Sequence, residues 1–358
     1  EIIVPQSYSL VLNQTGTLPL GGSTLSSSGA GKLKFEKVIN VSGGELEVSS
    51  GTLHFVSGGS GDSTVSVLAL EGATLVLNGN LSIGDKLKTS GDDPTLQLNG
   101  NNLDLSGNNV QLELGTGLVL DGVLTGTNTE LLLTEDSTIS RASPFTLGSI
   151  NLQNKALTLG SATSDMTVTG AVTFDSPSSQ ILTGEADLTL QSSSGFDLLS
   201  GKLSSTGGTL SLPYGMALGS GSVFDFSGSK VEFSGTLNNA LGSISSNSSS
   251  ILELQAPSSF TSTESFVIPT LDLNSQTLTL NTSTTHLKLS NPFTVGASES
   301  LDTQAGSLTL NGSATLEDGG IIESSAGPLT FNEGLELDSG SLFLTGGSVA
   351  LNSGATIS

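Results

Sequence analysis

Apolar residues recur along this chain in short alternating triplets. The clearest example is Leu308-Thr309-Leu310, which is followed by Asn311 and Gly312. Alternation of apolar and polar positions is typical of a β-strand that buries one face. The Gly, Asn, Asp and Ser residues that separate the triplets favour turns. The pattern therefore predicts a series of short strands joined by tight corners.

The triplets themselves return at a second, longer spacing. Equivalent apolar positions recur every 20 to 22 residues in four runs, namely Leu53, Leu75, Leu96 and Leu118; Leu188, Leu210, Val231 and Leu252; Leu287, Leu308, Leu329 and Val349; and Leu301, Ile321 and Leu342. Such a period is typical of a β-solenoid, in which neighbouring turns bury one another. We predict an all-β fold, a single parallel β-solenoid (β-helix) with about 21 residues and three short strands per turn. For 358 residues this gives about 17 turns.

The pattern also bears on domain organisation. Residues 1–32 are expected to form an entry or capping segment, or a contact between subunits, because Gly, Ser and Thr interrupt the triplets there. Residues 33–358 are predicted to form a continuous β-helix. Apolar positions echo at offsets of 111 and 121 residues, which indicates blocks near 33–143, 144–263 and 264–358.

The same echo supports one alternative fold, three tandem β-sandwich domains. Sandwich strands recur about every 8–12 residues and are joined by hairpins, whereas these triplets recur every six to nine residues. The chain also has no Trp and two Tyr, so the aromatic core of a sandwich is missing. The solenoid is therefore the favoured prediction.

An Asn follows the triplet in several turns, at Asn78, Asn99, Asn311, Asn332 and Asn352. Asp121 is expected in the same place one turn beyond Asn99. Asn adopts left-handed backbone conformations at corners more readily than most residues. In a stack, the same side chains can also hydrogen-bond from turn to turn, as amide ladders do in cross-β structures. We predict a structural ladder of this kind and no catalytic role for it.

The charge balance limits the partners. The chain has 33 acidic and 10 basic residues, which gives a formal net charge of -23. Nucleic acid and anionic membrane surfaces are not expected as partners, because both are bound through Lys and Arg. Membrane insertion is not expected either, since no stretch approaches the roughly 20 apolar residues of a spanning helix. With no Cys, the fold uses neither disulfides nor thiolate metal sites.

Three features carry candidate chemistry. Residues 58–63 are faintly similar to the calcium-binding nonapeptide of β-rolls, but the motif occurs once and lacks the spacing. The acidic pairs at 92–93, 135–136 and 317–318 offer carboxylates of the kind used in glycoside hydrolysis, without Arg, His or aromatic neighbours. His54 and His286 lie far apart in the sequence and do not indicate a shared metal site or a catalytic triad. We expect solvated corners, no cofactor, no metal and no enzymatic activity.

Both ends of the chain are expected to make contacts. The candidate contact residues are Ile2, Ile3 and Val4 at the start and Val349, Leu351 and Ile357 at the finish. A solenoid without a capping helix exposes unpaired strand edges, which can pair with another chain. Head-to-tail pairing of this kind gives open filaments. The sequence thus predicts end-to-end self-association.

The Leu-Thr-Leu-Asn-Gly unit at 308–312 and the Leu-Thr-Leu-Gly unit at 157–160 resemble the turns of right-handed parallel β-helices in bacterial extracellular proteins. These include autotransporter passengers, filamentous-haemagglutinin-like adhesins and filament subunits. The resemblance covers nearly the whole chain. It implies a secreted chain at the cell surface or beyond it, a structural or adhesive role, and no cofactor. The family's aromatic C-terminal membrane barrel has no counterpart in this sequence, so a mature passenger segment or a separate subunit is expected.

The leading hypothesis is a non-enzymatic extracellular structural protein, a subunit that stacks head to tail into a filament, sheath or surface appendage. An adhesin or passenger segment that binds a cell surface or a glycan is the first alternative, with Tyr214 and residues 238–250 as its candidate contacts. A polysaccharide-active β-helix enzyme is the second alternative. It would need carboxylates beside Arg and aromatic residues, and the sequence shows no such cluster.

Overall fold

The computed structural model describes residues 2–3, 5, 8–56, 62–92, 94–141, 144–160 and 162–352. The described residues contain β-strands, turns and bends, and no helix. The chain divides into two compact units, Glu1–Leu182 (unit 1) and Thr183–Ser358 (unit 2), and each is considered by itself.

Unit 1 consists of short strands, a few of which run through a corner and so serve two sides of a turn. Its strands are β1 (Ile2–Ile3), β2 (Ser9–Leu12), β3 (Gly16–Pro19), β4 (Thr24–Ser28), β5 (Lys32–Phe35), β6 (Ile39–Ser49), β7 (Thr52–Phe55), β8 (Ser63–Glu71), β9 (Thr74–Leu77), β10 (Leu81–Ser90), β11 (Thr95–Asp104), β12 (Gln111–Leu114), β13 (Leu118–Leu133), β14 (Ser137–Arg141), β15 (Phe145–Asn151), β16 (Ala156–Leu159), β17 (Met166–Val168), β18 (Val172–Thr173) and β19 (Gln180–Leu182).

Unit 2 is built in the same way, mostly from strands of three or four residues. Its strands are β20 (Leu188–Leu190), β21 (Phe196–Leu198), β22 (Lys202–Ser204), β23 (Thr209–Leu212), β24 (Met216–Leu218), β25 (Val223–Asp225), β26 (Lys230–Asn239), β27 (Ser243–Ser245), β28 (Ile251–Ser262), β29 (Ser265–Ile268), β30 (Thr270–Asp272), β31 (Thr277–Leu280), β32 (His286–Leu289), β33 (Phe293–Val295), β34 (Ser300–Asp302), β35 (Ser307–Leu310), β36 (Ala314–Leu316), β37 (Ile321–Ser324), β38 (Pro328–Phe331), β39 (Leu335–Leu337), β40 (Ser341–Leu344) and β41 (Ser348–Leu351).

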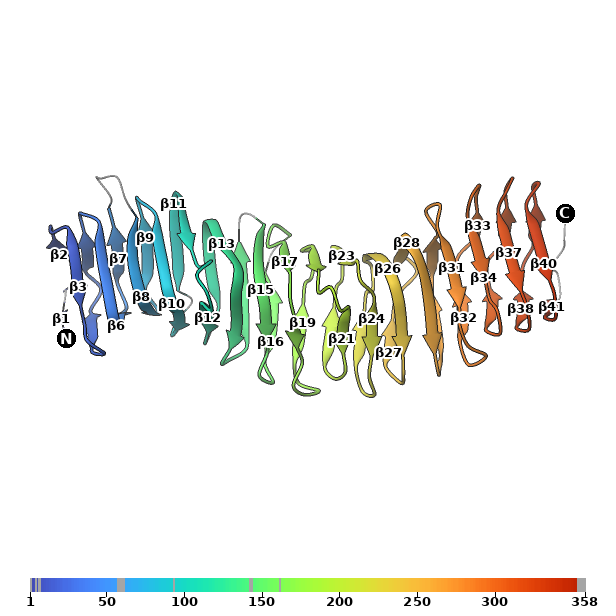
Figure 1. Cartoon of the computed structure of the whole chain (residues 1–358), viewed down its shortest axis with the longest axis horizontal. Coiled ribbons are helices and arrows are strands. Elements are labelled where there is room, and N and C mark those ends of the chain that lie inside the picture. The colour runs from blue at the N-terminus through green and yellow to red at the C-terminus, as the bar shows by residue number, and fades with distance from the viewer. Residues whose placement is uncertain are drawn as a thin grey trace. The chain divides into compact units, whose positions relative to one another are not determined.

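Within each unit, strands pair in parallel with the equivalent strands one turn later, so that successive turns lie side by side (Figure 1). In unit 1, β5, β7 and β9 form consecutive rungs. In unit 2, β29, β32, β35, β38 and β41 form one five-stranded sheet, and β33, β36 and β39 form another sheet. Stacking at about 21 residues confirms the predicted β-solenoid, with about 16 turns in all. The β-sandwich alternative is wrong, because sandwich sheets are antiparallel.

The strand register tests the predicted runs of apolar residues. The runs from Leu188 to Leu252 and from Leu287 to Val349 are confirmed, since each member is aligned with the next. Two assignments are wrong. Leu96 aligns with Leu120 instead of Leu118, which itself aligns with Ile139. Leu301 and Leu342 align with Ile322 instead of Ile321.

The N-terminal strands belong to the stack. Residues 1–32 are the predicted entry, capping or subunit-contact segment. Within this segment, β2 pairs with β5, β3 pairs with β6, and β4 pairs with both β1 and β6. The boundary between the two compact units follows Leu182 and does not coincide with the ends of the predicted blocks at 143 and 263.

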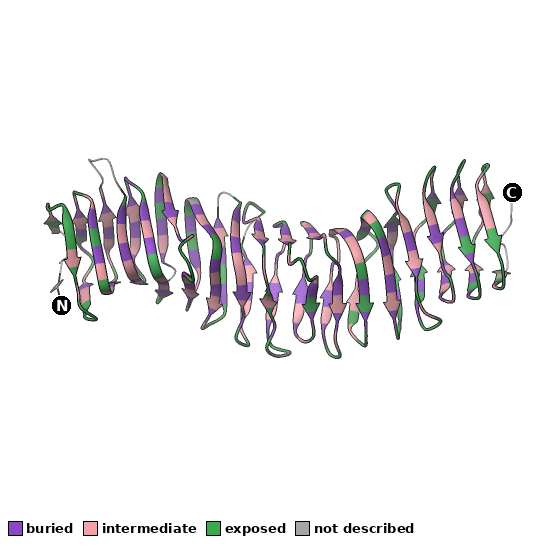
Figure 2. Cartoon of the chain, in the orientation of Figure 1, coloured by how far each residue is buried: buried purple, intermediate pink, exposed green. Residues whose placement is uncertain are grey.

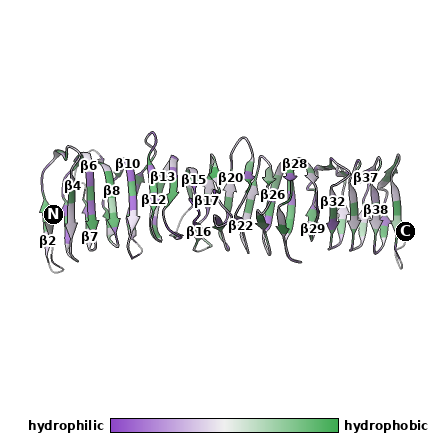
Figure 3. Ribbon diagram, turned by 90° about the horizontal axis from the view of Figure 1, so that it is seen from below, coloured by the Kyte–Doolittle hydropathy of each residue, from purple (hydrophilic) through white to green (hydrophobic). Residues whose placement is uncertain are grey.

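The core of each unit is one side chain deep. Inward positions of the triplets are buried, and the positions between them are intermediate or exposed, so that purple alternates with pink and green along the strands in Figure 2. Hydrophobic residues (green) and more hydrophilic residues (white to purple) also alternate along strands in Figure 3. Phe side chains thicken the core locally: Phe35 stacks on Phe55 with ring centroids 5.1 Å apart. In unit 2, Phe260 contacts Phe233 and Phe266 edge to face.

A core truncation should distinguish inward from outward positions. Leu308 is 1% exposed and aligns with Leu287 and Leu329, so Leu308→Ala leaves a cavity between two turns. We expect it to lower the free energy of unfolding of unit 2 by about 2–5 kcal/mol. Chemical denaturation followed by circular dichroism measures the change. The matched control is Thr309→Ala at the adjacent outward position, where we expect a change within about 0.5 kcal/mol. Equal losses in the two variants would contradict the assigned faces.

Candidate functional site

The predicted ladder residues of unit 2 lie in register at the ends of three strands. The backbone N–H groups of Asn311, Asn332 and Asn352 donate to carbonyls one turn earlier, at 2.8, 2.9 and 3.0 Å. This pairing places the three side chains one above another. Asn332 Nδ2 donates to Asn311 Oδ1 at 2.6 Å, and Asn352 Nδ2 donates to Asn332 Oδ1. These are the turn-to-turn amide hydrogen bonds that a structural ladder requires.

A second ladder lies in unit 1. Asn99 Nδ2 donates to Asn78 Oδ1 and to the Leu77 carbonyl, both at 3.1 Å. Asn78 Nδ2 in turn lies 3.0 Å from His54 Nε2. Because an amide N–H can only donate, His54 must accept through Nε2 and carry its proton on Nδ1. The sequence pattern did not include His54 in the ladder, since it sits at the centre of a triplet instead of after one.

Asp121 does not extend this ladder. It aligns with Gln97, two residues before Asn99, because the turn between them is longer than predicted.

The left-handed corner conformation is also rarer than expected among the five ladder residues, all of which are described. Asn99 adopts it with φ 50°, and the other four do not. Hydrogen bonding along the stack is therefore what the ladder positions share.

The predicted end residues are partly described. Ile2 and Ile3 form β1 and pair with Ser27 and Ser28. Val349 and Leu351 lie in β41 and align with Leu329 and Phe331. Val4 and Ile357 lie outside the described residues.

Of the other candidate sites, the acidic pair at 135–136 makes contacts with the next turn. Glu135 forms an ion pair with Lys155 at 2.8 Å, and Asp136 accepts a hydrogen bond from the Ala156 N–H at 2.9 Å. Both carboxylates thus interact with residues of the next turn. Glu317 and Asp318 are exposed, and residues 57–61 and 93 lie outside the described part. Among the described residues, no group of three or more His, Cys, Asp and Glu side chains could hold a metal ion, and no helix is long and apolar enough to cross a bilayer.

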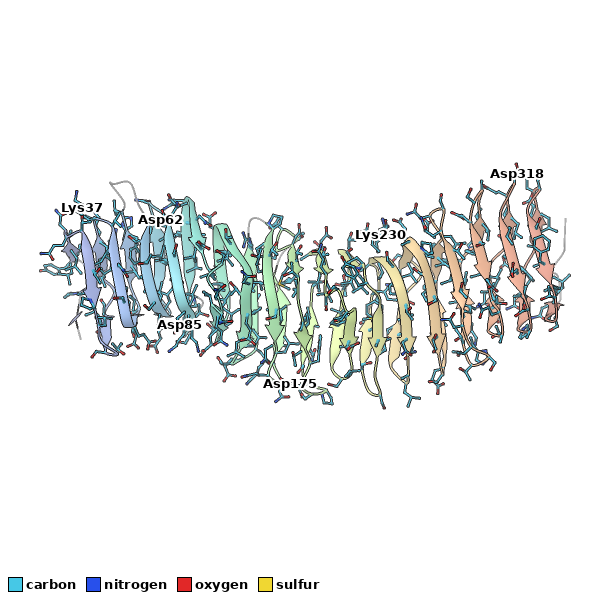
Figure 4. The ribbon with its side chains drawn as sticks, viewed as in Figure 1. Lys37, Asp62, Asp85, Asp175, Lys230 and Asp318 are labelled. Atoms are coloured by element: carbon cyan, nitrogen blue, oxygen red, sulfur yellow. The ribbon has the colours of Figure 1, made fainter. Side chains whose placement is uncertain are left out.

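Ion pairs join outward side chains of neighbouring turns. Lys230, labelled in Figure 4, lies between Glu253 at 2.9 Å and Glu232 at 3.2 Å. The hydrogen bond to Glu253, with Glu232 beside it, raises the pKa of Lys230. In unit 1, Lys86 pairs with Glu113 at 2.9 Å. All these side chains are partly exposed, so each pair contributes little to stability. Their effect is to limit repulsion between stacked carboxylates.

One cation is placed inside the stack. Arg141 aligns with Leu120 and is 5% exposed. Its Nη2 donates to the Gly122 carbonyl at 2.8 Å, and its guanidinium lies 4.7 Å from the centre of the Phe145 ring. Burial lowers the pKa of Arg141 to about 10, so the group is still charged at neutral pH. The alternating pattern did not predict a buried Arg141, because this polar residue takes the place of an apolar residue in the column of Leu96 and Leu120.

Comparison of the chain with models of known families, with curated proteins and with solved structures finds no match. The functional interpretation therefore starts from the geometry of the two units.

The ladder of unit 2 should appear as a coupling energy. In a double-mutant cycle with Asn311→Ala and Asn332→Ala, we expect the two changes to be non-additive by about 0.5–1.5 kcal/mol, because each removes the same hydrogen bond. Denaturant titration of the four proteins gives the value. The control cycle pairs Asn332→Ala with Asn281→Ala, whose Nδ2 donates to Thr261 in another column. Additivity in both cycles would show that the Asn311–Asn332 contact does not form in solution.

The ladder of unit 1 should make stability depend on pH. Burial, followed by the charges of Lys34 and Lys32, lowers the pKa of His54 below its ordinary value of 6.5. As the pH falls through 6.5, the unfolded chain takes up a proton before the folded chain does, so unit 1 loses stability toward the lowered pKa. We expect His54→Gln to flatten this dependence between pH 7 and 5, with unfolding free energies as the measure. The control His286→Gln makes the same substitution at the histidine of unit 2, which lies outside this ladder. A His54→Gln profile that matches the wild type would contradict the assignment.

Proposed function

We propose that this chain is a non-enzymatic extracellular structural protein whose terminal turns pair with those of a second copy, giving a head-to-tail filament, sheath or surface appendage. The observation that carries the proposal is the exposure of core positions in the last described turn. Leu351 is 43% exposed, whereas Phe331, the residue aligned with it one turn earlier, is fully buried. Leu344 is 43% exposed and aligns with Ser324, which is 1% exposed.

The strand edges of this turn support the same proposal. Among the described residues, β40 pairs with β37 and β41 pairs with β38, each on one side. Backbone N–H and C=O groups on the other side of such an edge can pair with a further strand. A strand that continues the stack must run parallel and bring its own apolar triplet into the column. The first turn of another copy has this character, because β2 carries Leu10 and Leu12 around Val11, followed by Asn13.

The first turn of unit 1 offers a complementary surface. A hollow of about 530 Å³ is lined by residues of β2, β3 and the corner between them, including Val11, Leu12 and Leu18, together with Ile39. Polar residues and a glycine, from Asn13 to Thr17, complete the lining. The apolar part of the hollow offers contacts for apolar side chains that project from a terminal turn, such as Leu344 and Leu351. The contact would be heterologous, so each added copy presents the same free end and growth continues. Extracellular location is part of the proposal and is supported by the resemblance of the repeat to bacterial surface β-helices.

A second candidate is an adhesive segment that binds a cell surface. It is favoured by two isolated exposed side chains of unit 2, Tyr214 at 54% and Leu241 at 55% exposure. Both lie in the stretches that the sequence singled out, but exposed apolar residues that occur singly are common on protein surfaces.

Charge placed in the terminal turn should prevent assembly. Replacing both exposed leucines, Leu344→Glu and Leu351→Glu, is expected to shift the protein from polymer to monomer, because two carboxylates would have to be buried in a neighbouring core. Sedimentation velocity and electron microscopy of the purified chain give the size distribution. The control is Val267→Glu, which changes an outward side chain of β29 that is 40% exposed, and it should assemble like the wild type. A wild-type chain that stays monomeric at high concentration, or a double variant that still polymerises, would overturn the proposal.

A further inference from the structure

A polar groove crosses several turns of unit 1 on the outside of the stack. It consists of two adjoining hollows of about 550 and 310 Å³, which share Asn109, Asn128 and Ser149. Its residues come from successive corners, beginning at Asp85 within β10 and ending at Thr169 and Gly170 after β17. Asp85 projects from the edge of the ribbon in Figure 4. The groove therefore runs from turn to turn and not along one strand.

The groove exists because successive corners differ in length. The corner at residues 106–110 spans five residues, and the next corner spans the three residues between Gly126 and Glu130. In the turn after that, Leu147 and Ser149 align with Gly126 and Glu130, so Gly148 alone forms the corner. The corners thus become shorter over these three turns, and a hollow is left beside the longer corners.

Two glycines of the lining, Gly148 and Gly170, lie where neighbouring corners pack closely. A Cβ atom at Gly148 would lie 2.9 Å from the carbonyl carbon of Asn128, and one at Gly170 would lie 2.6 Å from the Gly148 oxygen. Neither position can carry a side chain unless the backbone moves. Glycine at these positions therefore lets neighbouring corners stack closely.

The walls carry groups that both donate and accept hydrogen bonds. Four side-chain amides line them, from Asn108, Asn109, Gln111 and Asn128. Some are fixed by the fold: Gln111 Nε2 donates to Glu130 at 2.8 Å, and Asn109 is held in the left-handed region with φ 62°. Asn108 and Asn109 are exposed to solvent. Hydroxyl groups of Thr127, Ser149 and Thr169 add further donors and acceptors.

Three charged residues line the groove, namely Asp85, Lys86 and Glu130. Lys86 forms an ion pair with Glu113 at 2.9 Å, and Glu130 accepts from Gln111. Val110 is the apolar residue of the lining and is fully buried. An extended peptide would need an open strand edge or apolar side-chain pockets, and the described lining supplies neither. A polyanion would be repelled by a chain of net charge -23.

We propose that this groove binds an extended, neutral oligosaccharide. A side-chain amide offers both an acceptor and donors, which matches the adjacent hydroxyl groups of a sugar, although Gln111 already uses one donor on Glu130. Corners that repeat at about the 4.8 Å spacing of stacked strands offer the array to a linear chain. The groove is formed by unit 1 and does not include the terminal strands β40 and β41, so this proposal is independent of end-to-end assembly.

Titration of the full chain with cellohexaose and with maltohexaose tests the proposal. In a ¹⁵N-labelled sample, saturable shifts of Asn and Gln side-chain amide signals are expected with at least one sugar. Asn109→Gly keeps the left-handed conformation and removes one amide, and we expect it to weaken binding about 2- to 10-fold. The double variant Asn108→Ala, Asn109→Gly is expected to weaken binding by more than about 10-fold. Hydrogen exchange with bound sugar should slow at residues 106–111, 127–130 and 148–149.

The matched control is Asn154→Gly, which removes an exposed Asn of unit 1 with φ 66° that lies outside the groove lining. It should bind like the wild type, and unchanged circular dichroism would show that all variants fold. The absence of saturable shifts at sugar concentrations up to about 10 mM would overturn the proposal. Equal affinity in the wild type and the double variant would do so as well. Binding of an extended Gly-Ser peptide with the same sensitivity to Asn109→Gly would overturn the choice of a sugar as the ligand.

Discussion

Leu308 is buried because Leu287 precedes it by one turn and Leu329 follows it by one turn, each in exact alignment along parallel strands. No turn of this chain is thick enough to bury its own leucines, so the alignment of equivalent residues is the constraint on which the fold depends. Sequence between the triplets can vary in length only if the next triplet returns to its column. Corners are therefore the variable part of each unit, and strands are the constant part.

This constraint also decides where polar chemistry collects. Outward side chains recur at the same spacing as the core, so an amide meets an amide in the next turn and a carboxylate meets a lysine. The Asn ladders and the Lys230 ion pairs are the result. Where corners change length, as they do between Gly126 and Ser149, the outer surface becomes uneven and forms a groove. The hydrogen bonds and ion pairs between turns and the proposed ligand groove thus both result from the stacking of turns. The former lie where equivalent residues align, and the groove lies where corners differ in length.

The sequence predicted the fold, the spacing and most of the columns, because the run from Leu287 to Val349 is nearly periodic. It failed where the period alone cannot choose between neighbours. Leu118 and Leu120 face the same way in a strand, so a slip of two residues leaves the pattern intact, and Ile321 and Ile322 are adjacent apolar residues. His54, Arg141 and the groove were missed for another reason. Their surroundings are assembled from several turns, and residues such as Asn109 and Thr127 look like ordinary corner residues in one dimension.

The direction of the amide ladders has a chemical consequence for ageing. Asn78, Asn99 and Asn311 are each followed by Gly, and an unhindered glycine nitrogen favours attack on the preceding amide and its conversion to a carboxylate. Asn99 is a donor, to Asn78 Oδ1, so a carboxylate there would face an acceptor and break the rung. Asn311 is an acceptor, from Asn332 Nδ2, so a carboxylate there would keep its hydrogen bond and strengthen it with charge. Conversion at Asn99 would therefore weaken the ladder of unit 1, whereas conversion at Asn311 would spare the ladder of unit 2, because the first amide is a donor to its neighbouring Asn and the second is an acceptor.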